Sequence, residues 1–132
     1  MILVLALGAL AYWRYKQSER HFQETLAAMD ELGPRVDTEG CVSAVLAWHE
    51  RCEADKNLCD HGVPRVITHC LVGADRRSTC DGLDLSSAQA QWVFERCEQR
   101  GTPCGDRKNC ACASAYRAID SFCRHGQEGV SL

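Results

Sequence analysis

Proline, basic runs and recognisable catalytic motifs are scarce or absent in this sequence. Only 3 of its 132 residues are proline and no tract is of low complexity, which argues against long disordered linkers. No stretch alternates apolar and polar residues for long enough to predict a β-strand, so a nearly all-α fold is expected. The glycine-rich loops that bind dinucleotides or phosphates are missing, and so are the HExxH and GxSxG motifs. These absences argue against the enzyme classes that depend on such motifs. A net charge of −3 without a Lys/Arg run predicts no binding to nucleic acid.

Cysteine, in contrast, is abundant. Ten cysteines in a chain of 14.7 kDa approach the density of a disulfide-stabilised scaffold. Because the count is even, every cysteine has a partner available, and an oxidising compartment is expected. The length predicts one small domain with an appendage, and thin helices alone bury too little core to be stable without cross-links.

The cysteine spacing predicts an α-hairpin. CVSAVLAWHERC (41–52) and CDHGVPRVITHC (59–70) are both Cys-x10-Cys and are separated by six residues. Eleven residues at 3.6 per turn return to within about 20° of the starting direction, so both cysteines of a segment share one helix face. Apolar residues at i+4 and i+7 complete the stripe of an amphipathic helix. Folding the two helices antiparallel about the connection 53–58 brings these stripes into register. The pairs predicted by that register are Cys52–Cys59 and Cys41–Cys70.

The second half of the chain is a degenerate copy of the first. CASAYRAIDSFC (112–123) repeats the spacing. Counting back from Cys97 reaches Ser86 where a fourth cysteine is expected, and Ser86 has the character of a helix N-cap. Cys80, six residues upstream in a loop, is predicted to supply the missing thiol, and the long connection 98–111 holds one more pair. The predicted disulfides are Cys80–Cys123, Cys97–Cys112 and Cys104–Cys110. In the alternative, Cys97–Cys104 repeats the six-residue spacing of the first hairpin and leaves Cys110 and Cys112 for other roles.

The first 13 residues, MILVLALGALAYW, differ in kind from the rest. They are uncharged and almost wholly apolar, and as a helix they span about 20 Å of the ~30 Å hydrocarbon core. Tyr12, Trp13 and Tyr15 are typical of a membrane–water interface. Residues 1–15 are therefore predicted to be a retained membrane anchor in contact with lipid, completed by a partner or by local thinning of the bilayer. The rival interpretation is a signal peptide with a cleavage-like site at 9–11, against which stand the missing basic region and the short apolar run.

Two signals disagree about the orientation of this anchor. Arg14, Lys16 and Arg20 follow the apolar run, which by the positive-inside rule places the cysteine-bearing part on the reducing side. The ten cysteines favour the oxidising side and carry more weight, but the sequence leaves the conflict open.

Helix-ending residues and cysteine spacing divide the chain into three predicted segments. Phe22, Leu26 and Met29 share one face of the first helix, which Gly33 is expected to end. Pro64 is placed in the first turn of the second helix of the first hairpin, where a missing N–H costs little. The segments are the anchor with its amphipathic helix (1–33), the first disulfide-stapled hairpin (41–71) and the second, degenerate hairpin (80–125).

With these features the chain resembles the coiled-coil-helix-coiled-coil-helix family of the mitochondrial intermembrane space, in its tandem-hairpin form. The hallmark of that family is an α-hairpin with twin Cys-x9-Cys motifs and with inner and outer disulfides, and some members have Cys-x10-Cys in one arm. The resemblance covers 41–123. The matching residues are Cys41, Cys52, Cys59 and Cys70, with a partial second copy at Cys97, Cys112 and Cys123. This chain departs from the pattern in having ten intervening residues in both first arms and in having Ser86 in place of a cysteine.

The resemblance implies a non-catalytic accessory or assembly subunit of a respiratory-type membrane complex. Such a subunit is anchored in the mitochondrial inner membrane, faces the intermembrane space and has other subunits of its complex as partners. A stapled α-hairpin also suits a bacterial periplasm. An envelope component anchored in the bacterial inner membrane and facing the periplasm is therefore an alternative hypothesis.

Two chemical roles compete with a structural one. Cys110-Ala-Cys112 has the form of a redox-active pair, because a Cys-x-Cys at a helix N-terminus has a depressed thiolate pKa. A thiol oxidoreductase or copper handler is therefore a further hypothesis, although structural pairing is favoured because Cys112 has a register partner. No CxxC motif accompanies the histidines that lie near thiols in the sequence, so no metal site is predicted. No cofactor and no catalytic residue are predicted either. The histidines concerned are His49, His61, His69 and His125. Trp48 and Trp92 are interpreted as core or contact residues.

Overall fold

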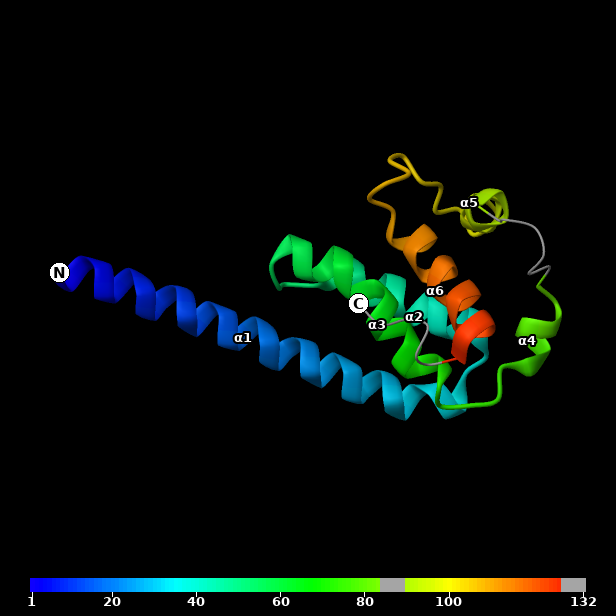
Figure 1. Cartoon of the computed structure of the whole chain (residues 1–132), viewed down its shortest axis with the longest axis horizontal. Helices are drawn as coiled ribbons and strands as arrows, with labels where there is room; N and C mark the ends of the chain where they lie inside the picture. Colours follow the sequence, from blue (N-terminus) through cyan, green and yellow to red (C-terminus); the bar gives the residue numbers. More distant parts are fainter. Residues whose placement is uncertain (84–89, 127–132) are drawn as a thin grey trace.

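The protein is a set of α-helices from which one long helix projects. The structure, a computed structural model, describes residues 1–83 and 90–126, and this part contains no strand. The elements are α1 (Ile2–Leu32), η1 (Gly33–Arg35), α2 (Thr38–Arg51), α3 (Lys56–Leu71), α4 (Arg77–Asp81), α5 (Ala90–Gln99) and α6 (Ala111–His125). In Figure 1 the N-terminal half of α1 points away from the cluster formed by the other helices. The prediction of an all-α fold is confirmed.

The second half of α1 packs against α3. Phe22, Leu26 and Met29, which the sequence places on one face, are buried in the core. The helix ends at Leu32, directly before Gly33 as predicted, and a 3-10 turn follows. Gly33 is required by packing here, because a side chain at this position would collide with the carbonyl oxygen of Cys70. The ends of α1 and α3 therefore meet backbone to backbone.

The first hairpin consists of α2 and α3. Asp37 begins α2 by accepting a hydrogen bond from the N–H of Gly40 (2.7 Å), and Asp55 begins α3 by accepting one from the N–H of Asn57 (2.9 Å). Such caps satisfy N–H groups that have no partner inside the helix. The slim residues of the facing stripes are fully buried between the two disulfides of this hairpin. These residues are Val45, Val63 and Val66.

The position predicted for Pro64 is wrong. Because Asp55 caps α3, the helix begins at Lys56, and Pro64 lies in the helix interior rather than in its first turn. A proline there offers no N–H to the carbonyl of Asp60, four residues earlier. The helix nevertheless continues to Leu71, and the hydroxyl of Thr68 donates to the carbonyl of Pro64 at 2.7 Å.

The loop predicted around Cys80 is also wrong. Cys80 lies in the short helix α4, where its N–H donates to the carbonyl of Arg76 at 3.0 Å. The turn begins because the carboxylate of Asp75 accepts a hydrogen bond from the N–H of Arg77 at 2.9 Å. The N-cap predicted at Ser86 falls outside the described residues.

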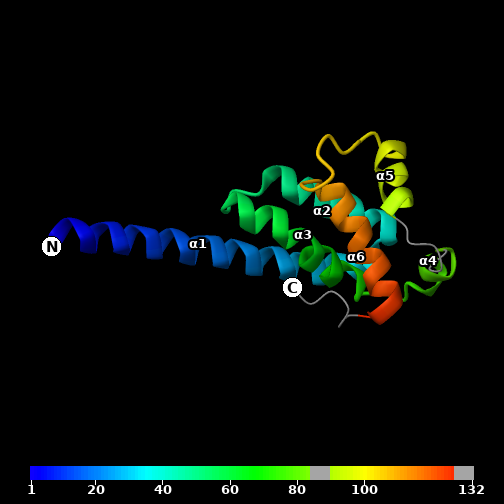
Figure 2. The same cartoon turned by 45° about the horizontal axis from the view of Figure 1, so that its top comes forward.

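Helix α6 joins the second half of the chain to the first hairpin. Figure 1 and Figure 2 both show α6 crossing the hairpin, and it contacts α2 and α3. Tyr116 and Ile119 of α6 and Val93 of α5 are buried in the same core as Val45 and Val66. The two hairpins therefore share one continuous core.

A helix that crosses a membrane must be both long and apolar. Within residues 1–83 and 90–126, no helix combines the length and the apolar character that crossing a bilayer requires.

Candidate functional site

The apolar side chains in the N-terminal turns of α1 are exposed to solvent. These residues continue a helix whose second half is packed on α3, so they are held away from the core (Figure 2). Each residue from 1 to 5 is at least 70 % exposed, and Leu7 and Leu10 are 59 % and 55 % exposed. The structure thus presents the predicted anchor segment as an uncovered apolar surface.

Aromatic and basic side chains follow directly after the apolar turns. The predicted interface residues are all about two-thirds exposed on α1. They are Tyr12, Trp13 and Tyr15. Arg14 and Lys16 alternate with them, and Lys16 pairs with Glu19 at 3.0 Å. The hydrogen bond that Lys16 donates to Glu19 raises the pKa of Lys16, so this side chain stays positively charged. We call residues 12–16 the aromatic–basic belt.

An open cleft of about 830 Å³ lies between α1 and the tip of the first hairpin. Its lining includes Arg14, Tyr15 and His21 from α1 and Glu53, Asp55 and Leu58 from the hairpin tip. A smaller hollow of about 260 Å³ continues past Leu58 to Arg65. Tyr15 belongs both to the belt and to the cleft, so the cleft opens beside the belt.

All ten cysteines are joined in disulfides. The pairs are Cys41–Cys70, Cys52–Cys59, Cys80–Cys123, Cys97–Cys112 and Cys104–Cys110, and the alternative pair Cys97–Cys104 does not form. In the first hairpin the bridged Cα atoms are 5.7 and 6.0 Å apart, closer than the usual 8–10 Å between helix axes. Cys110 and Cys112 belong to different disulfides, so the Cys-Ala-Cys segment is not itself a disulfide pair.

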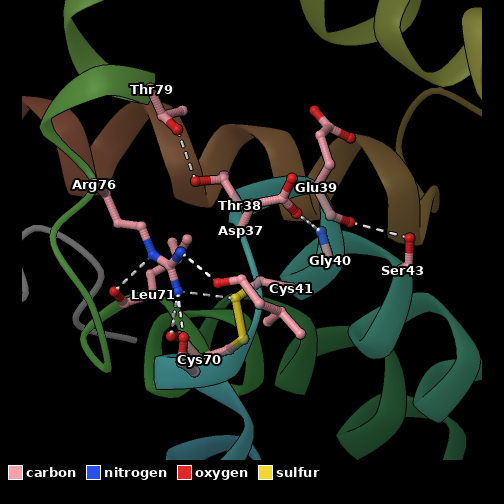
Figure 3. Close-up of a disulfide and its surroundings, with 12 residues drawn as sticks. Asp37, Thr38, Glu39, Gly40, Cys41, Ser43, Cys70, Leu71, Arg76 and Thr79 are labelled. Carbon is pink, nitrogen blue, oxygen red and sulfur yellow. Dashed lines mark hydrogen bonds between the residues drawn. A yellow bond between two sulfur atoms is a disulfide. The ribbon is translucent and has the colours of Figure 1, made fainter.

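A buried arginine that the sequence analysis did not single out holds the base of the first hairpin. Arg76 is only 7 % exposed, and desolvation lowers its pKa. Its side chain donates to the carbonyl oxygens of Leu71 (3.1 Å), Val36 (2.8 Å), Gly33 (2.9 Å) and Cys70 (3.1 Å), and it lies 3.6 Å from Sγ of Cys41. Figure 3 shows the guanidinium beside Leu71, Cys70 and the Cys41–Cys70 disulfide.

Arg76 therefore donates to carbonyl groups at two helix ends, where the supply of intrahelical N–H donors stops. Only a weak feature of the sequence points to this role of Arg76. The residue lies five positions beyond the end of α3, in a region where basic side chains reach the last carbonyls of a helix.

Polar contacts also tie the second hairpin to the first. Glu39, in the first turn of α2, accepts hydrogen bonds from the hydroxyl of Tyr116 (2.8 Å) and from Nη1 of Arg100. Arg100 also donates to the hydroxyl of Ser43. Burial, and then the hydrogen bond to Glu39, raises the pKa of Tyr116 to about 12. The phenol therefore stays protonated and donates across the junction between α2 and α6.

The histidines weighed as metal ligands make other contacts or face solvent. His49 is hydrogen-bonded to Asp60 at 2.7 Å, which lowers the pKa of Asp60, and His69 is hydrogen-bonded to Asp30 at 2.8 Å. His61 and His125 are exposed. In the described part of the chain, the side chains close enough together to share a metal ion are those of Cys97, Cys104 and Cys110, without a histidine among them.

The tryptophans interpreted as core or contact residues have that role. The ring of Trp48 lies 6.0 Å from that of Phe22, inside the core. Trp92 lies 5.7 Å from Tyr116, edge to face, at the contact between α5 and α6.

Comparison with protein-family models, with curated proteins and with solved structures found no match.

Proposed function

We propose that this protein is a non-catalytic accessory or assembly protein that binds membrane lipid through residues 1–15. The single observation that supports this most is the exposure of the apolar turns of α1 beyond the core (Figure 1). A contiguous apolar surface is unfavourable in water and marks a place where lipid or protein binds. Lipid is favoured because the aromatic–basic belt follows, in the order typical of a membrane–water interface.

The dimensions suit a helix that enters one leaflet. Residues 2–11 make about 15 Å of helix, which is half of the ~30 Å hydrocarbon core. Trp13 and its aromatic neighbours then lie at the headgroups, where Arg14 and Lys16 meet lipid phosphates. The positive-inside rule concerns helices whose flanks are sorted across the bilayer. For a helix in one leaflet, the basic residues and the disulfide-bearing part lie on the same side without conflict.

The five disulfides favour an oxidising compartment. The resemblance of the first hairpin to the coiled-coil-helix-coiled-coil-helix family favours the intermembrane-space face of the mitochondrial inner membrane, with subunits of a respiratory-type complex as partners. The periplasmic face of a bacterial inner membrane provides the same chemistry and is the alternative location. Fractionation of native cells distinguishes the two.

A thiol oxidoreductase or copper handler is the second candidate function. The observation in its favour is the partial exposure of the Cys104–Cys110 disulfide beside Cys97. The two functions differ in the result expected for Cys110→Ser. A structural disulfide predicts unchanged redox states of neighbouring proteins, whereas an oxidoreductase predicts that client proteins accumulate in reduced form.

Vesicle flotation tests the lipid-binding function. Full chain with intact disulfides is floated with phosphatidylcholine vesicles, which carry no net charge. We expect Leu3→Lys/Leu7→Lys to lower the partition coefficient by about a hundredfold, because two exposed leucines no longer enter the apolar layer.

The matched control is Gln17→Lys/Gln23→Lys, which adds the same two charges at exposed polar positions of α1. It should float like the unchanged chain. Equal flotation of the leucine and glutamine variants, or no flotation of the unchanged chain, contradicts the proposal.

A further inference from the structure

The open cleft beside the aromatic–basic belt has walls of opposite charge. Arg14 contributes a guanidinium from α1, and Glu53 and Asp55 contribute carboxylates from the tip of the first hairpin. At about 830 Å³ the cleft is within the usual range of ligand sites, roughly 300–1,000 Å³. Figure 1 and Figure 2 both show the tip of the hairpin, where α2 connects to α3, pointing toward the N-terminal end of α1. The cleft therefore lies at the end of the helix cluster that is nearer to the apolar turns.

The charged groups of the cleft form no ion pairs within the described part of the chain. There the side chains of Arg14 and Glu53 make neither an ion pair nor a hydrogen bond. Asp55 uses its Oδ1 atom to cap α3, which leaves its second carboxylate oxygen available. The neighbouring Lys16 differs, because it is paired with Glu19 at 3.0 Å. A positive charge on one wall and negative charges on the other are thus available to a ligand.

We propose that this cleft binds the headgroup of a zwitterionic phospholipid with a primary ammonium group, the chemistry of phosphatidylethanolamine. The inference rests on the proposed lipid-binding function. Arg14 donates to the phosphate, which a guanidinium binds in a bidentate manner. Glu53 and Asp55 accept hydrogen bonds from the ammonium, whose three N–H groups suit the carboxylate oxygens that the protein leaves free. A single ligand thus neutralises charge on both walls.

Other common headgroups fit these walls less well. The quaternary ammonium of phosphatidylcholine has no N–H to donate, and proteins that select such a group enclose it in a cage of aromatic rings. Instead of such a cage, the lining of this cleft in the described chain offers Tyr15 and the imidazole of His21. An anionic headgroup such as that of phosphatidylglycerol brings no cation to the carboxylates, which repel its phosphate. The charges therefore favour a primary ammonium.

The position of the cleft along α1 also suits a headgroup. In the proposed membrane-bound state, residues 2–11 lie in the apolar layer and the aromatic–basic belt lies at the headgroups. Arg14 and Tyr15 belong to both the belt and the cleft, so the cleft begins at the depth of the lipid phosphates. A lipid in the same leaflet therefore reaches the cleft with its headgroup while its acyl chains stay beside the apolar turns.

Flotation with two kinds of vesicle tests this site. Full chain with intact disulfides is floated with phosphatidylcholine alone and with equal parts of phosphatidylcholine and phosphatidylethanolamine. We expect the ethanolamine lipid to raise the partition coefficient by about fivefold, a modest gain because the cleft carboxylates are exposed. Glu53→Gln should reduce this gain to about twofold or less. Asp55→Asn should do the same, because asparagine keeps the cap of α3 and removes only the charge.

The matched control is Glu50→Gln, the same change at an exposed position of α2 outside the cleft lining. It should keep the full gain, and every variant should float with phosphatidylcholine like the unchanged chain. Ethanolamine lipid also changes the packing of the bilayer, but that effect acts on all variants alike. Equal gains for Glu53→Gln and Glu50→Gln, or no gain for the unchanged chain, overturn the inference and leave the lipid-binding function standing. Failure of the unchanged chain to float with either kind of vesicle overturns both.

Zero-length cross-linking provides a second measurement, on the unchanged chain. A water-soluble carbodiimide joins a carboxylate to a primary amine that is in contact with it, and peptide mass spectrometry locates the lipid adduct. We expect phosphatidylethanolamine adducts at Glu53 or Asp55, about fivefold more abundant than at Glu50, because the amine is held beside the first two carboxylates. Adducts of equal abundance at Glu50, or none at the hairpin tip, overturn the inference.

Discussion

Nη2 of Arg76 donates to the carbonyl oxygen of Gly33 at 2.9 Å, joining residues 43 positions apart in the chain. The same nitrogen donates to the carbonyl oxygen of Cys70 at 3.1 Å. One guanidinium thus connects the end of α1 to the end of α3 beside the outer disulfide (Figure 3). The projecting helix and the stapled core are held together at this point.

Arg76→Ala should lower the free energy of unfolding by about 3 kcal/mol, because several buried carbonyl groups lose a charged donor at once. The measurement is guanidinium denaturation with the disulfides intact. Arg77→Ala, at an exposed neighbouring position, is the matched control and should change stability by about 0.5 kcal/mol or less. Similar denaturation midpoints for both variants would contradict the structural role of Arg76.

Tyr116 predicts a loss of stability at high pH. Its pKa is raised from 10.0 to about 12 in the folded protein, so the folded state holds a proton that the unfolded state releases between these values. The stabilising contribution is complete below pH 10 and is lost as the pH rises through about 12. Tyr116→Phe should flatten this part of the stability profile, measured by denaturation at a series of pH values. An unchanged slope in the variant would show that Tyr116 is not responsible.

The disulfides should differ in their contribution to stability. Cys80–Cys123 joins residues 43 positions apart, whereas Cys52–Cys59 joins residues 7 apart. On the chain-entropy model their removal costs about 4 and 2.5 kcal/mol, respectively. Paired substitution by alanine and guanidinium denaturation should therefore show the larger loss for Cys80→Ala/Cys123→Ala. A larger loss for the short bridge would mean that its native packing outweighs its effect on the unfolded chain.

Trp13 should act as an interfacial contact. We expect Trp13→Ala to lower partitioning to phosphatidylcholine vesicles by about tenfold, since a large amphipathic side chain no longer enters the interface. Gln17→Ala, one turn further along α1, provides the control. If both substitutions reduce partitioning equally, the belt does not lie at the interface.

The two disulfides of the first hairpin could be predicted because helix register is a local property. An offset of eleven positions between cysteines sets the face on which each thiol lies, and antiparallel folding then matches Cys41 with Cys70. The buried stripe containing Val45 and Val66 follows from the same periodicity. Residues 1–13 are exposed, which agrees with a segment predicted to contact lipid instead of the protein core.

Contacts between distant segments could not be predicted in this way. Nothing in the spacing indicates that α6 crosses both α2 and α3, or that Arg76 reaches the carbonyl of Gly33. The helical state of Cys80 depends on a turn begun by the Asp75 side chain, and the interior position of Pro64 depends on the cap at Asp55. The helix at Cys80 and the start of α3 each depend on a single side chain that the hydrophobic pattern does not show.

The central claim is that the apolar end of α1 holds the chain on a membrane while its cysteines stay oxidised. The most direct test is the intact mass of the chain recovered from carbonate-washed native membranes after alkylation without reduction. The account predicts that the chain stays in the membrane pellet and gains no alkyl group, because residues 1–15 bind lipid and all ten cysteines are paired. Recovery of the chain in the carbonate wash, or a mass increased by alkylated thiols, would contradict it.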